Sequence, residues 1–308
     1  MLLKYQHTIS KPVSLEGIGL HTGKISKICI LPGETDKGII FKRTDLNNNN
    51  LIEANYKNVS RGKLCTTLEN QDGIKVSTVE HLLAALFIAE VDNAIIEINN
   101  EEVPIMDGSA KDFLEILKKT EIVPQSKKRK YLKILNNVEL KDSVRKIGIE
   151  PSETSFEVNF QLNYKNRIIG NQKNCINFNL DKLEEICNSR TFCLFEDIEK
   201  IKELGLAKGG SLDNAIVVDG EKILNDKGLR NSKEFVNHKI LDLAGDFLLA
   251  GYRVIGKVNC YQGGHELTNM FLRRLFENKN AFTYLEIGNV IVSEGKITPR
   301  SSSLAVNA

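Results

Sequence analysis

The chain has 308 residues, of which 41% are hydrophobic and 27% are charged. Such a chain buries an ordinary hydrophobic core and is expected to fold as two domains, which excludes a wholly disordered protein. The 42 basic and 40 acidic residues leave a formal net charge of only +2, so no global field attracts nucleic acid or an anionic membrane.

The first half is predicted to begin with strands and to end as helix, strand, helix. Up to about residue 78, short apolar runs are separated by Gly, Pro, Asp and Asn, and LCTTLENQDGIKVST is typical of a hairpin around an Asp-Gly turn. In the segment STVEHLLAALFIAE, Ser77 and Glu80 fit a capping box before an apolar helix. A strand at 93–99 and an amphipathic helix at about 109–121 complete this half.

The most concentrated basic run, KKRK at 127–130, separates two patterned regions. It contains no interleaved aromatic residues, so we interpret it as a solvated linker rather than as a site for a polyanion. The run marks a boundary between a first domain at 1–126 and a second at 131–308.

The second half repeats the order of elements seen in the first. Strands are predicted for YLKILNNVEL, RKIGIE and FEVNFQLNY, followed by a helix near 181–188, and the next segment predicts a helix, a Gly-rich turn and a strand that form an insertion. The helix EFVNHKILDLAGDFLLAGY, the strand YRVIGKVNCYQ and the helix HELTNMFLRRLFEN follow. Because both halves end as helix, strand, helix, we expect two α/β domains of similar build.

Cysteine usage and the N-terminal residues predict a cytoplasmic protein. The six cysteines include no Cys-x-x-Cys pair, which is typical of reduced thiols. The start MLLKYQHTISKPV lacks the apolar core of a signal peptide. No apolar run approaches the roughly 20 residues that span a bilayer, so we expect no stable membrane insertion.

One face of the helix at 234–252 carries His238, Asp242 and Asp246. Positions four apart are neighbours on a helix, so His238 and Asp242 can bind one ion. The pair Glu80 and His81 stands in the early part of the corresponding helix of the first half. Two histidines and one carboxylate leave a coordination position open for water, as zinc hydrolases require, and Glu80 can then take up the proton of that water.

Each of these residues also has a purely structural interpretation. His238 fits an ordinary helix histidine, and Glu80 fits the acid of the capping box. Asp242 and Asp246 fit solvated positions, although unpaired carboxylates among their apolar neighbours would be costly. His-x-x-x-Asp is a short pattern that arises by chance, and spacing alone cannot pair His81 with a residue so distant in the chain.

Seven blocks of sequence carry a resemblance to one enzyme family. They are LEGIGLHTG at 15–23, STVEHLLAAL at 77–86, PIMDGSA at 104–110, SRTF at 189–192, GLAKGGSLDNAIVVD at 205–219, FVNHKILDLAGD at 235–246 and GGHELTN at 263–269. In this order, and over nearly the whole chain, they resemble the UDP-3-O-acyl-N-acetylglucosamine deacetylases, the zinc amidases of bacterial lipid A biosynthesis. The resemblance favours the metal interpretation over the structural one.

The resemblance implies an α+β fold of two similar α/β domains, each a mainly antiparallel sheet packed against two helices, with the active site at their interface. It implies that His81, His238 and Asp242 bind Zn²⁺, with Fe²⁺ as an alternative occupant of the same site. The implied partner is the UDP-3-O-acyl-N-acetylglucosamine substrate, without nucleic acid, and the protein is expected to be a monomer.

The same resemblance implies the catalytic roles. Glu80 is the general base, and Thr191 hydrogen-bonds the oxyanion of the tetrahedral intermediate. His265 is the cation beside that intermediate and the general acid that protonates the departing amine. Asp246 orients His265 and favours its charged form.

Substrate contacts are implied beyond the metal. Lys239 is expected to meet phosphate or sugar oxygens, and Phe192 to offer an apolar surface to the sugar. A βαβ insertion at about 194–224 is expected to form a hydrophobic passage for the acyl chain. Its candidate walls are Ile198, Ala207, Gly210, Ser211, Ala215 and Val217.

Two other functions are compatible with parts of the pattern. A mononuclear non-haem iron oxygenase also uses two histidines and one carboxylate, but its ligands usually come from a β-barrel rather than from one helix. A metal-free lipid or nucleotide carrier would keep the fold without the chemistry, although every catalytic position of the family is filled here.

Overall fold

We describe residues 2–60 and 64–288 of a computed structural model of the chain. The first half contains strands, a short 3-10 helix and two α-helices: β1 (Tyr5–Ile9), β2 (Val13–Ile18), β3 (Ile25–Pro32), β4 (Ile39–Arg43), β5 (Leu51–Glu53), η1 (Tyr56–Asn58), β6 (Val59–Ser60), β7 (Thr67–Glu69), β8 (Lys75–Ser77), α1 (Glu80–Ile88), β9 (Ala94–Ile98) and α2 (Lys111–Leu117). Its main sheet has the order β2-β3-β9-β4-β5, in which only the β9 and β4 pair is parallel. The expected hairpin is confirmed, because β7 and β8 pair antiparallel.

The second half is built in the same manner on a larger sheet. Its elements are β10 (Ile122–Lys128), β11 (Lys130–Ile134), β12 (Val138–Asp142), β13 (Arg145–Glu150), β14 (Phe156–Asn163), β15 (Asn171–Asn177), α3 (Glu184–Cys187), β16 (Phe192–Leu194), α4 (Phe195–Glu203), β17 (Ile216–Asp219), β18 (Lys222–Ile223), α5 (Glu234–Leu248), β19 (Arg253–Tyr261), α6 (His265–Glu277), η2 (Lys279–Ala281) and β20 (Phe282–Glu286). Seven strands form the sheet, and β19 lies at its centre, where it pairs with β11, β13 and β14.

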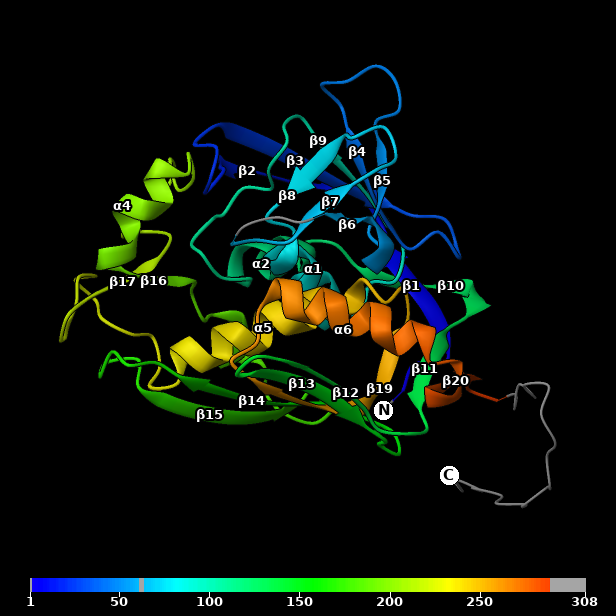
Figure 1. Cartoon of the computed structure of the whole chain (residues 1–308). Helices are drawn as coiled ribbons and strands as arrows, with labels where there is room; N and C mark the ends of the chain where they lie inside the picture. Colours follow the sequence, from blue (N-terminus) through cyan, green and yellow to red (C-terminus); the bar gives the residue numbers. More distant parts are fainter. Residues whose placement is uncertain (1, 61–63, 289–308) are drawn as a thin grey trace.

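The helices of both halves form one layer between the two sheets (Figure 1). Helix α2 contacts β2 of the first sheet, while α5 contacts β14 and β15, and α6 contacts β12 and β13 of the second. Helices α1 and α5, one from each half, pack against each other in the middle of this layer. Each sheet therefore turns one apolar face inward, as the alternating buried residues of β3 and β14 illustrate.

This arrangement confirms the expected α+β fold of two similar halves with mainly antiparallel sheets. The repeated order helix, strand, helix is also confirmed, as α1, β9, α2 in one half and α5, β19, α6 in the other. Among the residues described, no helix is long and apolar enough to cross a membrane.

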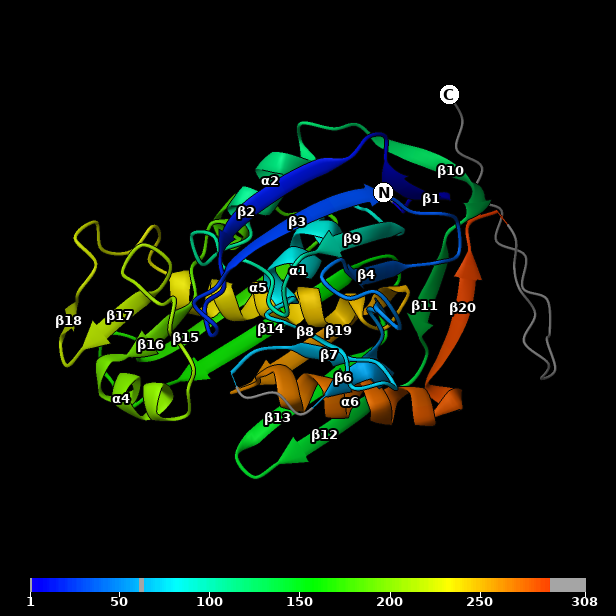
Figure 2. The same cartoon turned by 90° about the horizontal axis from the view of Figure 1, so that it is seen from above.

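A small βαβ unit follows the SRTF segment. Strands β16 and β17 are parallel and are joined through α4, and β18 extends this sheet. Figure 2 shows these elements at one end of the molecule, beyond the start of α5. The unit corresponds to the segment predicted as an insertion. Its first strand, β16, begins at Phe192.

The interpretation of KKRK as a solvated linker is wrong. Lys128 ends β10 and pairs with Tyr5 of β1, and Lys130 begins β11. Arg129 is only 2% exposed. Arg129 is buried because it pairs with the acids Glu90 and Asp92, and these partners are too distant in the chain for local composition to reveal them.

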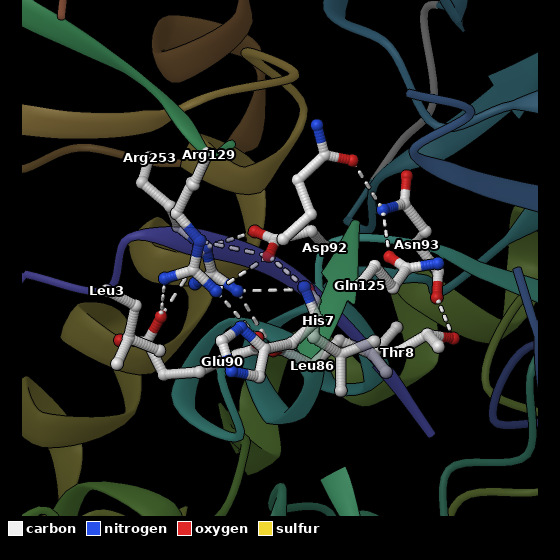
Figure 3. Close-up of polar contacts among 12 residues, drawn as sticks. Leu3, His7, Thr8, Leu86, Glu90, Asp92, Asn93, Gln125, Arg129 and Arg253 are labelled. Carbon is white, nitrogen blue, oxygen red and sulfur yellow. Dashed lines mark hydrogen bonds and ion pairs between the residues drawn. The ribbon is translucent and has the colours of Figure 1, made fainter. Parts of the chain in front are cut away.

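A buried ionic cluster joins the two halves at this point (Figure 3). Arg129 contacts Glu90 and donates from Nη2 to Asp92 Oδ2 at 2.6 Å. Arg253 belongs to β19. Its Nε lies 3.4 Å from Asp92 Oδ1, and its Nη1 donates to the carbonyl of Phe87 at 2.5 Å. Arg253 thus provides donors for the C-terminal end of α1, whose last carbonyls have no partners within the helix.

Replacement of Arg253 by Met is expected to lower the free energy of unfolding by about 3 kcal/mol, because Asp92 and the α1 carbonyls then lose a buried donor. Arg167→Met is the control, since the Arg167 side chain is 86% exposed in its pair with Glu221 and exposed pairs contribute little. Urea unfolding of both variants measures the difference. Equal stability of the two variants would contradict a structural role for the cluster.

Candidate metal centre

The crossing of α1 and α5 depends on a glycine. A Cβ on Gly245 would lie 2.1 Å from the carbonyl oxygen of Glu80 and 3.0 Å from the amide nitrogen of Ala84. Glycine costs about 1 kcal/mol relative to alanine inside a helix, so its presence here is explained by the close approach of the two backbones. The crossing places the first turn of α1 against the C-terminal half of α5.

Three buried side chains converge at this crossing. His81 Nε2 and His238 Nε2 lie 3.4 and 3.3 Å from Asp242 Oδ1. Tetrahedral coordination with metal–ligand distances near 2.0–2.1 Å places neighbouring ligand atoms about 3.3–3.4 Å apart. Together the three residues form a group able to hold a metal ion, so the sequence expectation of a shared site is matched by the geometry.

The charge state of the three residues also suits a cation. Within residues 2–60 and 64–288, Asp242 Oδ1 is buried without a hydrogen-bond partner, which is costly unless a cation neutralises it. Burial opposes ionisation of Asp242, but positively charged neighbours such as Lys239, whose Nζ lies 2.9 Å from Oδ2, hold the pKa of Asp242 well below the ordinary value. Burial lowers the pKa of His238 to about 3, so the imidazole is neutral, and its Nδ1 donates to the carbonyl of Ser189 at 3.0 Å. Nε2 therefore carries the free lone pair that a metal requires.

Glu80 faces this group from the start of α1. The predicted capping box is wrong, because the helix begins after Val79 without a side-chain cap and Ser77 Oγ donates to the carbonyl of Glu101 instead. Glu80 Oε2 accepts from the backbone amide of Thr66 at 3.0 Å. Burial raises the pKa of Glu80, opposed by His265 and His81. A raised pKa moves a carboxylate toward the range of an effective general base.

His265, the first residue of α6, completes the polar group. Its Nδ1 lies 2.8 Å from Asp246 Oδ2, and its Nε2 lies 3.7 Å from Glu80 Oε1. Burial and the helix N-terminus disfavour a cation, yet Asp246, Glu80 and Asp242 together raise the pKa of His265 to about 10. The imidazole is consequently protonated at neutral pH.

Lys239 and Phe192 also lie next to the ligand group. Lys239 Nζ donates to Asp242 Oδ2 at 2.9 Å and stands 5.7 Å from the centre of the Phe192 ring. The Phe192 ring in turn lies edge-on to His238, with 6.3 Å between ring centres. Lys239 is thus paired with an oxygen of Asp242, one of the three candidate ligands.

A buried ion pair, missed by the sequence analysis, anchors the SRTF segment. Arg190 Nε donates to Glu234 Oε1 at 2.8 Å, and Glu234 is fully buried at the start of α5. This pair fixes the segment whose Ser189 carbonyl orients His238. Thr191 follows directly, half-buried, and its backbone amide donates to the carbonyl of Gly108 at 2.8 Å.

The six candidate walls of an acyl passage all belong to the small βαβ unit or to its loops. Ile198 is half-buried on α4, and Val217 is buried in β17 beside Cys193 of β16. The remaining four lie between these elements: Ala207 is half-buried, Gly210 and Ser211 are exposed, and Ala215 is buried. The structure therefore brings the metal-ligand and acid–base residues together, whereas the six walls are distributed over both exposed and buried positions.

Cys65 lies close to the acidic residues of the site. Burial, together with the charge of Glu80, raises the pKa of its thiol to about 12, and thiols bind metals as thiolates. Cys65 is one of six cysteines with free thiols in the part of the chain that the structure describes.

A metal-ligand group of two histidines and one aspartate, flanked by a buried glutamate and a His–Asp pair, is typical of hydrolases that activate water. A family model described as UDP-3-O-acyl N-acetylglycosamine deacetylase matches residues 6–277. The chain belongs to this family, as the resemblance of its seven sequence blocks predicts.

Curated relatives agree over almost the full length. The chain is 40% identical over 295 residues to the UDP-3-O-acyl-N-acetylglucosamine deacetylase of Syntrophotalea carbinolica, covering 96% of this chain and 94% of the relative. It is 38% identical to the enzymes of the same name from Phenylobacterium zucineum and Haemophilus ducreyi, covering 90% and 91% of this chain and 95% and 92% of those relatives.

Proposed function

We propose that the protein hydrolyses the N-acetyl group of UDP-3-O-(3-hydroxyacyl)-N-acetylglucosamine to acetate and the free amine, the committed step of lipid A biosynthesis. Membership in the deacetylase family over nearly the whole chain carries this proposal. The buried group of His81, His238 and Asp242 supports it independently, because its geometry and charge suit a cation.

His81, His238 and Asp242 are proposed to hold Zn²⁺, with Fe²⁺ as a possible occupant of the same donors. A zinc ion there supplies Lewis acidity and lowers the pKa of a bound water to about 7. Lys239 neutralises the second oxygen of Asp242, which leaves Oδ1 directed at the two histidines.

The remaining residues are proposed to move protons and to stabilise charge. Glu80 accepts a proton from water as the water oxygen bonds to the acetamide carbonyl carbon. The hydroxyl of Thr191 and the protonated His265 hydrogen-bond the carbonyl oxygen, which becomes negative. Asp246 stabilises the imidazolium of His265 through Nδ1. His265 then gives its Nε2 proton to the nitrogen of the sugar as the bond between that nitrogen and the carbonyl carbon breaks.

Substrate recognition is proposed to extend away from these groups. Phe192 offers an apolar surface beside the ligands, and Lys239 a positive charge for oxygens of the sugar or diphosphate. The βαβ unit at 194–224 is proposed to hold the acyl chain. The division into domains at 1–126 and 131–308, the monomeric state and the cytoplasmic location remain proposals as well.

An acetate-release assay tests the function. Purified protein supplied with UDP-3-O-acyl-N-acetylglucosamine is expected to release one acetate per free amine formed, to lose activity on treatment with a chelator and to regain it with Zn²⁺. The Asp242→Asn variant is expected to bind less metal, because a neutral amide is a weaker ligand than a carboxylate. Substrate binding without acetate release by the metal-loaded protein would favour the carrier, and oxygen consumption with an oxoacid would favour the oxygenase.

A further inference from the structure

Thr66 connects the two acids that the proposed reaction uses outside the metal ligands. It precedes β7 and is 2% exposed. Its backbone amide donates to Glu80 Oε2 at 3.0 Å, and its hydroxyl donates to Asp246 Oδ1 at 2.7 Å. Glu80 belongs to α1 and Asp246 to α5, so a single residue of a hairpin binds acids from both halves of the protein.

The other oxygen of each acid faces the same imidazole. Asp246 Oδ2 lies 2.8 Å from His265 Nδ1, and Glu80 Oε1 lies 3.7 Å from His265 Nε2. Thr66, Glu80, His265 and Asp246 therefore form a closed ring of polar contacts. In this ring both carboxylates use one oxygen to contact the imidazole and the other to accept a hydrogen bond from Thr66.

Asp246 accepts or shares a hydrogen bond at both oxygens, whereas Glu80 is held by the Thr66 amide at one oxygen and by the charge of His265, 3.7 Å away, at the other. A carboxylate held through only one oxygen can still rotate about its last side-chain bond, whereas a second bond to a buried, fixed donor removes that freedom. Displacements of reacting groups by about 1 Å can cost about 100-fold in rate. The hydroxyl of Thr66 is directed at the Asp246 oxygen that does not face His265, so it acts through the acid rather than on the substrate.

We propose that Thr66 is a positioning residue, which fixes the general base Glu80 and the His265–Asp246 pair in one mutual geometry. The proposal rests on the proposed deacetylase function. It adds a residue from a third segment of the chain, the β6–β8 hairpin sheet, to the α1, α5 and α6 residues that carry the chemistry.

The Thr66→Val variant separates the hydroxyl from the rest of the residue, because valine keeps the shape and the backbone amide. Its kcat is expected to fall about 10- to 100-fold, the usual range for partners that orient catalytic groups, with KM and bound metal little changed. Thr66→Ser is expected to restore most of kcat, because serine keeps the hydroxyl.

Thr8→Val is the matched control. Thr8 belongs to strand β1, outside the site, and is 6% exposed. Its hydroxyl donates to the carbonyl of Asn93 at 2.7 Å. This variant loses a buried hydroxyl of the same kind and is expected to keep its kcat. An equal loss of kcat in Thr8→Val, or wild-type kcat in Thr66→Val, would overturn the proposal.

A second measurement does not require turnover. The proton on His265 Nδ1, hydrogen-bonded to Asp246, is expected to give a low-field NMR signal that shifts or broadens in Thr66→Val and returns in Thr66→Ser. An unchanged signal in Thr66→Val would overturn the positioning role even if the wild-type protein released no acetate. A wild-type protein without acetate release would instead refute the proposed function, so the two failures are distinguishable.

Discussion

Replacement of Glu80 by Gln is expected to reduce acetate release by about 10²- to 10⁴-fold, the contribution typical of a positioned general base. Glutamine has nearly the same shape, and its carbonyl oxygen can still accept from the amide of Thr66. Its amide group cannot take up a proton from water. The bound metal should therefore remain near the wild-type amount, as measured by elemental analysis of the purified variant alongside the acetate assay.

Glu266→Gln is the control for this variant. Glu266 is the next residue after His265 on α6, but its side chain is 65% exposed, so the same chemical change outside the polar group should leave turnover unaffected. Undiminished turnover by metal-loaded Glu80→Gln would remove Glu80 from the mechanism. A large loss of metal in the same variant would instead assign Glu80 to metal binding.

Replacement of Gly245 by Ala is expected to weaken metal binding and folding together. The new Cβ would lie 2.1 Å from the carbonyl oxygen of Glu80, a backbone atom of a buried helix that cannot move alone. Helix α1 must then shift away from α5, which pulls His81 away from His238 and Asp242. Overpacking of this kind costs about 1–3 kcal/mol.

The sign of the stability change makes this prediction decisive. In an isolated helix, alanine is favoured over glycine by about 1 kcal/mol, so a purely local effect would stabilise the protein. Urea unfolding of the metal-free protein and calorimetric titration with Zn²⁺ measure the two effects separately. Increased stability with unchanged metal affinity would show that the helices do not depend on glycine for their close approach.

Patterns of local origin were predicted correctly from the sequence. Apolar periodicity and turn residues indicated the strands, the hairpin and the repeated order of helix, strand and helix, because these features depend on neighbouring residues. The two wrong interpretations concerned residues whose partners are distant. Arg129 is buried and pairs with Glu90 and Asp92, and Glu80 accepts from the amide of Thr66 rather than capping its own helix.

The candidate site divides in the same way. Helix periodicity placed His238, Asp242 and Asp246 on one face, the repeated order of elements suggested His81 and Glu80, and the family resemblance supplied Thr191 and His265. No pattern indicated Thr66, since a threonine in a hairpin is common and its two acid partners lie in α1 and α5. The Arg190–Glu234 pair was missed for the same reason.

By itself, the sequence determined the elements, the polar face of α5 and, through its family blocks, the class of chemistry. Tertiary structure alone decided that His81 lies 3.4 Å from Asp242 and that His265 lies 2.8 Å from Asp246. The physical reason is that a helix fixes only the relative positions of residues a few places apart. Contacts between α1, α5 and α6 depend on packing, and the close approach of α1 and α5 depends on Gly245.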